Sequence, residues 1–148
     1  MSDSIFVMLK KENMPTAKEW SDKIKSEGFG LEIDTSYEEE ENSNGIYGFR
    51  PCKYYNVDDI GYELDILSRD ENQEDFEEWN EEYPELKQYD LAVIFGIFEE
   101  DDAVAATVAG AVLTKMSEGV FFDIDEPVEI DDLYSMAKKM DADMKQRS

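Results

Sequence analysis

The stretch that most constrains the fold is residues 91–125, where two apolar runs flank a segment of small residues. The first run, LAVIFGIF over residues 91–98, is too short to span a membrane and has the length of a buried strand. The acidic residues 99–102 follow as a natural helix start, and residues 103–118 predict a helix of small apolar residues that ends before Gly119. Gly110 within this helix costs about 1 kcal/mol relative to alanine, so we expect close packing to offset it. A second strand follows Gly119, and the whole unit predicts the core of the protein.

The N-terminal part of the chain predicts a strand, a helix and a second strand. Residues 4–9 form a short apolar run of the kind found in buried strands. Thr16 and Glu19 have the spacing of a capping box and begin a helix that ends at Gly28. Residues 29–34 alternate apolar and polar side chains, which predicts a half-buried strand.

The middle of the chain predicts further strands joined by turns. Residues 37–45 contain four consecutive glutamates and end in an Asn-Gly pair, which is typical of a solvated hairpin connection. Residues 46–57 have a β-rich composition interrupted by Pro51, so we expect an edge strand, a bulged strand or two short strands. Residues 61–66 alternate and predict another half-buried strand.

Two more helices are expected. Residues 70–89 predict the most acidic helix, which Pro84 ends or kinks. Its narrow apolar stripe consists of Phe76, Trp79, Tyr83 and Leu86. We expect Trp79 and Tyr83 to be core residues of this amphipathic helix. Residues 130–145 predict a C-terminal helix, whose buried face is marked by Leu133, Ala137, Met140 and Met144.

These elements predict an α+β fold. The chain has 148 residues, which is a natural length for a single domain over residues 1–148. We expect a mixed or antiparallel sheet with three to four helices packed on it. The unit at residues 91–125 can supply one right-handed parallel crossover.

The charge is strongly negative and unevenly distributed. There are 38 acidic and 14 basic residues, which gives a net charge of −24. Residues 32–90 carry most of this excess. Such a charge repels nucleic acid and anionic membranes and attracts basic proteins or cations. We therefore expect no nucleic-acid or membrane partner.

Little in the sequence supports catalysis. The chain has no histidine, which removes the usual general base and the Ser-His and Cys-His nucleophile pairs. Cys52 is the single cysteine, and we interpret it as a packed or incidental residue. Two acidic runs, residues 70–74 and 123–126, carry oxygen ligands at alternate positions but lack the glycine and distal glutamate of an EF-hand. We predict a protein that is not an enzyme, without cofactor or metal, although weak calcium binding and a carboxylate-based, cation-dependent enzyme stay open.

The sequence also indicates a location. A single cysteine cannot form an intramolecular disulfide, which favours a reducing compartment. The N-terminus lacks a secretion-signal pattern, and no window is long and apolar enough for a transmembrane helix. We therefore expect a soluble, cytoplasmic protein.

One motif resembles a known class of proteins. Residues 106–123 match the pattern AxxAGAxLxxxSxGVxFD, in which an alanine-rich helix leads into a strand that begins with glycine. This pattern is similar to that of small bacterial immunity proteins of polymorphic and contact-dependent toxin systems. The resemblance implies a single α+β domain in the cytoplasm that binds and neutralises one cognate toxin domain. The negative charge agrees independently, because a nuclease toxin needs a basic surface.

The predicted binding surface is the acidic third of the chain, where tyrosines accompany the carboxylates. Tyr54 and Tyr55 are adjacent in a predicted strand, so we expect one of them to face outward. The predicted toxin-binding residues are Glu38, Glu39, Glu40, Glu41, Tyr54, Tyr55, Asp70, Glu71, Glu74, Asp75, Glu77, Glu78, Glu81 and Glu82. An alternative function is a DNA mimic that inhibits a DNA-binding protein.

Overall fold

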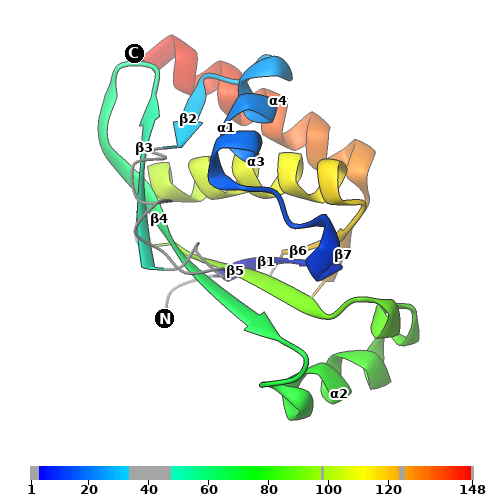
Figure 1. The fold of residues 1–148 in the computed structure, drawn as a ribbon. Helices are drawn as coiled ribbons and strands as arrows, with labels where there is room; N and C mark the ends of the chain where they lie inside the picture. The colour runs from blue at the N-terminus through cyan, green and yellow to red at the C-terminus, as the bar shows by residue number, and fades with distance from the viewer. Residues whose placement is uncertain (1–3, 34–47, 98, 124–125, 148) are drawn as a thin grey trace.

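The computed structural model describes residues 4–33, 48–97, 99–123 and 126–147 (Figure 1). Its strands are β1 (Ser4–Leu9), β2 (Leu31–Ile33), β3 (Gly48–Tyr54), β4 (Val57–Ser68), β5 (Leu91–Gly96), β6 (Val120–Asp123) and β7 (Glu126–Val128). Its α-helices are α1 (Ala17–Ser26), α2 (Gln73–Glu82), α3 (Glu100–Ser117) and α4 (Ile130–Arg147). Two short 3-10 helices are η1 (Lys11–Asn13) and η3 (Pro84–Gln88). The predicted turn at residues 37–45 lies outside the described residues.

The seven strands form one sheet in the order β2-β3-β4-β5-β1-β6-β7, and every neighbouring pair is antiparallel. β1 lies between β5 and β6, with Val7 opposite Val93 on one side and Phe121 on the other. β5 and β6 both run antiparallel to β1, so they are parallel to each other with β1 between them. The predicted strand–helix–strand unit is therefore present, and its crossover spans one intervening strand.

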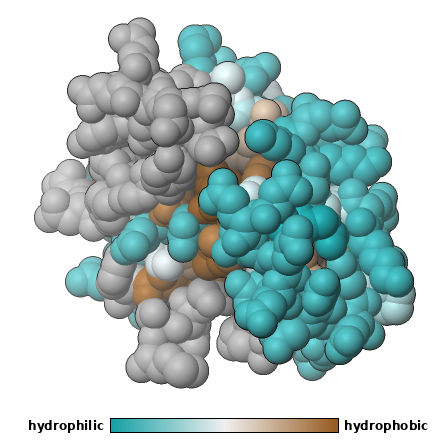
Figure 2. Space-filling model, turned by 60° about the horizontal axis from the view of Figure 1, so that its bottom comes forward, coloured by the Kyte–Doolittle hydropathy of each residue, from teal (hydrophilic) through white to brown (hydrophobic). Residues whose placement is uncertain are grey.

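The helices cover the two faces of the sheet unequally. α1, α3 and α4 lie over one face, and α2 with η3 lies against the other (Figure 1). Successive side chains of β1 point to opposite faces of the sheet, so this strand contributes to both hydrophobic clusters. Val7 belongs to the large cluster under α3, and Met8 belongs to the smaller cluster under α2. Figure 2 looks onto the α2 side and shows a broad hydrophilic surface with hydrophobic side chains visible beside it. The predicted α+β fold, with helices packed on an antiparallel sheet, is confirmed.

α3 is the centre of the larger layer, as its small residues predict. Residues 105–114 of this helix are all buried. A Cβ atom added at Gly110 would lie 2.7 Å from Cε2 of Phe121, so glycine allows the helix to approach β6 closely. On the opposite flank, the indole Nε1 of Trp20 donates a hydrogen bond of 2.9 Å to the Ala109 carbonyl oxygen. The close packing expected around Gly110 is therefore present, at the position where glycine lowers the stability of α3.

The predicted signals at element ends are mostly confirmed. At α1, the Glu19 amide donates to Thr16 Oγ1 over 3.1 Å and the Thr16 amide donates to Glu19 Oε1 over 2.9 Å, which completes the capping box. α2 ends just before Pro84, as expected. The pairing of β3 with β4 shifts register between Cys52 and Tyr54, so the bulged strand is the correct alternative.

Several boundaries and one burial pattern differ from the prediction, and the helix predicted over residues 70–89 is divided into α2 and η3. The predicted strand over residues 46–57 ends at Tyr54, a turn follows, and β4 then runs continuously from Val57 to Ser68. In α4, Leu133, Ala137 and Met144 are buried as predicted. Asp141 is buried as well, whereas Met140 is only half-buried. The prediction placed only apolar residues on this face and so missed a buried carboxylate.

Candidate functional site

The acidic face of α2 is the strongest candidate for a functional surface. α2 packs onto the sheet with a narrow stripe, in which Phe76 is buried and Trp79 is half-buried. The remaining positions of α2 and of the turn before it carry exposed carboxylates. We call this set the α2 acidic face, and it comprises Asp70, Glu71, Glu74, Asp75, Glu77, Glu78, Glu81 and Glu82.

α2 is fixed in place by aromatic contacts and by one arginine. The Phe6 ring stacks on Trp79 at 5.3 Å between centroids and on Phe122 at 4.7 Å. The Arg69 guanidinium lies 4.9 Å from the centre of the Phe76 ring and donates from Nε to the Tyr89 carbonyl oxygen over 3.1 Å. The basic residue nearest in sequence to α2 is thus directed at backbone oxygens and a ring, and its charge is not paired with the α2 acidic face.

No ion pair joins the α2 acidic face to a basic side chain in the part of the chain that the structure describes. The ion pairs found there are Lys18–Asp22, Lys25–Glu32, Lys115–Glu27 and Arg147–Asp101. All of them join residues of α1, β2, α3 and α4 or the residue that caps α1. Among the described residues, the carboxylates of α2 therefore have no ion-pair partner, and water and salt ions screen their charge.

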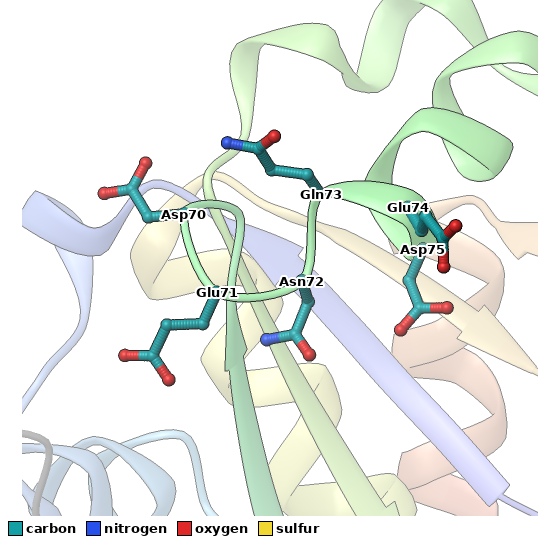
Figure 3. A pocket seen from close by; sticks show the side chains of 6 residues that line it. All are labelled: Asp70, Glu71, Asn72, Gln73, Glu74 and Asp75. Carbon is teal, nitrogen blue, oxygen red and sulfur yellow. The ribbon is translucent and has the colours of Figure 1, made fainter.

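The turn before α2 forms an open, polar hollow of about 500 Å³. It is lined by Asp70, Glu71, Asn72, Gln73, Glu74 and Asp75. The carboxylates of Asp70 and Asp75 point in different directions, away from a common centre (Figure 3). Across residues 4–33, 48–97, 99–123 and 126–147, no three Asp, Glu, Cys or His side chains gather so that they could hold a metal ion. The second acidic run considered for calcium includes residues 124–125, which are not among those described.

The two predicted tyrosines lie in one polar cluster, in which Tyr54 is buried and Tyr55 is half-buried. Tyr54 is fully buried and its hydroxyl donates to Asp141 Oδ1 over 2.7 Å. The half-buried Tyr55 donates to Asp141 Oδ2 over 2.7 Å, and the Gly30 amide donates to Oδ1 over 3.0 Å. We call Asp141, Tyr54, Tyr55 and Gly30 the Asp141 cluster. It joins α4 to the β2 side of the sheet.

The prediction that one of these tyrosines faces outward holds only in part, because Tyr55 is half-exposed but its hydroxyl is directed at Asp141, for a local reason. Tyr55 lies in the turn after β3 with a φ of +53°, so strand alternation no longer applies and its ring stacks on Tyr54 at 5.5 Å. A Cβ at Gly30 would lie 2.2 Å from the Tyr55 ring, so only glycine admits this arrangement. Tyr54 is removed from the candidate docking residues, and Tyr55 serves the Asp141 cluster.

The Asp141 cluster also changes the pKa values of its two tyrosines. Burial, followed by the hydrogen bond and charge of Asp141, raises the pKa of Tyr54 well above its usual range. The same causes raise the pKa of Tyr55 to about 12. Both hydroxyls therefore stay protonated donors throughout the physiological range. The sequence signal for Asp141 was its position four residues after Ala137, on the apolar face of a helix.

The remaining predicted residues are only partly tested. Glu38, Glu39, Glu40 and Glu41 fall outside the described residues. Tyr83 is half-buried, as is Trp79, and packs against Phe122 at 5.4 Å between ring centres. The expectation that Trp79 and Tyr83 are core residues is therefore only partly correct, because both are partly buried against the smaller hydrophobic cluster. Both lie at the boundary between the smaller hydrophobic cluster and the α2 acidic face.

Comparison with known proteins adds no relative. No family model, no curated protein and no solved structure matches this chain. Among the helices that the structure describes, none is both long enough and apolar enough to cross a membrane.

Proposed function

We propose that this protein is a non-enzymatic binding protein that neutralises a basic partner, such as a toxin domain of the kind blocked by bacterial immunity proteins. The observation that carries the proposal is the α2 acidic face, whose eight exposed carboxylates form no ion pair within the described residues. The resemblance of residues 106–123 to immunity proteins supports the choice of partner.

The arrangement of charges on α2 lowers its own stability. Glu74 and Glu78, and likewise Glu77 and Glu81, are like-charged residues one helical turn apart. Each such pair destabilises a helix by about 0.2–0.5 kcal/mol, whereas a lysine at the second position would stabilise it. A surface serving stability alone would alternate the charges. A basic partner relieves the repulsion and is drawn in by the uncompensated field.

The edge of the α2 acidic face also offers aromatic anchors. Trp79 and Tyr83 are each half-buried and lie beside the carboxylates. Tryptophan and tyrosine contribute large contact areas at protein interfaces, and surrounding charged residues steer the encounter. The combination suits a protein partner better than a small molecule.

DNA mimicry is the alternative function, and the length of α2 weighs against it. Ten helical residues span about 15 Å, at about 1.5 Å per residue. Duplex DNA rises about 3.4 Å per base pair, so α2 alone imitates about four base pairs. A DNA mimic must block several unrelated DNA-binding proteins, so its activity against a panel of them separates the two functions.

The experiment is a growth-rescue assay in cells that express a candidate toxin domain encoded beside this gene. The test variant replaces Glu74, Glu77, Glu78 and Glu81 with glutamine. The matched control removes the same number of charges elsewhere, at the exposed residues Glu12, Glu126, Glu129 and Asp143. We expect rescue by the wild type and the control and loss of rescue by the α2 variant. Equal rescue by both variants would refute a role for the α2 acidic face.

A further inference from the structure

The sheet face that carries α2 is not covered evenly by the described elements. Two pairs of facing residues in β1 and β5 point to this face, Met8 with Ala92 and Phe6 with Ile94. Met8 and Ala92 are buried in the smaller hydrophobic cluster, whereas Phe6 and Ile94 are only half-buried. Figure 2 shows hydrophobic side chains at the surface beside the hydrophilic residues on this side of the molecule.

Ile94 is the unusual residue of this face. It lies in β5, the middle strand of the seven, and among the described residues it belongs to neither hydrophobic cluster. A solvated face of an antiparallel sheet carries polar side chains, as β4 does with the exposed Glu63 and Asp65. Ile94 instead continues an apolar row, because it faces Phe6, whose ring stacks on Trp79 at 5.3 Å. We call Ile94, Phe6 and Trp79 the open strip.

Carboxylates border the open strip on two sides. Asp65 of β4 lies directly opposite Ile94 in the strand register and is exposed. On α2, Asp75 and Glu82 lie one helical turn before and after Trp79 and are exposed as well. No ion pair between described side chains involves any of these three carboxylates. The open strip is therefore an apolar row between two negative margins.

The charges decide between the possible occupants of the open strip. A second copy of the chain would bring the same carboxylates against one another, and like charges facing each other at an interface are repelled. A segment with an apolar side flanked by basic residues is complementary to the strip and to both margins.

The sheet geometry favours a helix over a strand as that segment. The backbone of β5 is already hydrogen-bonded to β1 and β4, so a strand laid on this face gains no backbone partners, whereas a helix satisfies its own. β5 separates β4 from β1, so Asp65 and Phe6 are about 10 Å apart across the sheet. This distance is about the width of one α-helix with its side chains.

We propose that the open strip binds an amphipathic basic helix of the partner. The apolar side of the helix packs on Ile94 and Phe6, and its lysine or arginine side chains reach Asp65 on one margin and the carboxylates of α2 on the other. The proposal rests on the proposed function, because it names the element of the basic partner that docks beside the α2 acidic face. It extends the binding surface to β1, β4 and β5.

The test uses two leucine–lysine peptides of identical composition and charge, each about 14 residues long, which is enough for about four helical turns. One peptide repeats leucine at helical spacing, and the other has the same residues in an order without periodicity. Each is titrated at low salt into protein with ¹³C-labelled isoleucine methyl groups. We expect the amphipathic peptide to shift the Ile94 methyl resonance saturably and to bind about tenfold more tightly, because it alone presents a continuous apolar side.

Two matched pairs of variants locate this preference. Ile94→Thr should bring the affinity ratio of the two peptides to about one, whereas Ile130→Thr makes the same change at an exposed residue of α4 and should leave the ratio unchanged. Asp65→Asn and Asp143→Asn each remove one exposed carboxylate, and only Asp65 borders the strip. Asp65→Asn should weaken the amphipathic peptide about two- to fivefold more than Asp143→Asn does. The second pair decides the matter even if Ile94→Thr fails to fold.

The outcomes separate this proposal from the function on which it rests. Equal binding of the two peptides overturns the helix site and leaves the α2 acidic face supported as a docking surface. Equal effects of Asp65→Asn and Asp143→Asn overturn it in the same way. Self-association of the free protein that shifts the Ile94 methyl on dilution assigns the open strip to a second copy and overturns the basic helix. Absence of binding by either peptide at low salt overturns both proposals.

Discussion

Replacing Asp141 with alanine is the sharpest perturbation of the fold. The change removes the acceptor of three hydrogen bonds, from the Tyr54 hydroxyl, the Tyr55 hydroxyl and the Gly30 amide. Tyr54 is fully buried, so its hydroxyl is left without a partner, which costs about 1–3 kcal/mol. Tyr55 and Gly30 are half-buried and regain some hydrogen bonding to water. Together we expect a loss of about 3–5 kcal/mol in the free energy of unfolding.

The assay is urea unfolding followed by tryptophan fluorescence. A loss of this size is a large part of the stability of a typical domain, about 5–15 kcal/mol. The control is Asp143→Ala, an exposed carboxylate on the same helix, which should change stability by less than about 0.5 kcal/mol. Asp141→Asn keeps one acceptor oxygen and should lie between the two. A loss below about 1 kcal/mol for Asp141→Ala would refute the reasoning, because no buried donor would then depend on this carboxylate.

Three further predictions follow from the packing and the pKa shifts. The pKa of Tyr54 is raised in the folded state, so Tyr54 contributes its full share to the free energy of unfolding below about pH 10, and this share is lost as the pH rises further. The loss has a slope of about 1.4 kcal/mol per pH unit. Tyr54→Phe should remove this slope from unfolding curves measured at alkaline pH. Gly110→Val should lower the unfolding free energy by about 1–3 kcal/mol in the same urea assay, since its side chain meets the buried Phe121 ring. Arg69→Met should speed hydrogen exchange in residues 73–88, because it removes the bonds to backbone oxygens and the contact with Phe76; unchanged exchange would contradict the anchoring role.

Much of the fold follows from local patterns in the sequence. The apolar run of β5 and the small residues of α3 predict buried elements, because burial on nearly all sides leaves no room for polar periodicity. The capping box at Thr16 and the stop at Pro84 depend only on residues a few positions apart. The position of β1 between β5 and β6 has no such local signal, since strand order is decided by long-range packing.

The candidate site is less predictable for the same reason. The exposed carboxylates of α2 could be placed because helical spacing separates them from Phe76 and Trp79. The burial of Tyr54 could not be predicted, because it depends on a hydrogen bond to Asp141, which lies 87 residues away in the chain. The turn at Tyr55, with its positive φ, also breaks the alternation on which the prediction depended. Long-range polar contacts and irregular turns thus limit how much of the candidate site can be predicted from the sequence.

The most direct test of the α2 acidic face is the salt dependence of partner binding. The dissociation constant for a basic toxin domain encoded beside this gene should be measured by calorimetry at 50 mM and 300 mM salt. We expect about tenfold weakening for the wild type, because screening shortens the reach of the carboxylates. The variant with glutamine at Glu74, Glu77, Glu78 and Glu81 should bind weakly at both concentrations. Wild-type binding that is insensitive to salt and unchanged in this variant would contradict the account.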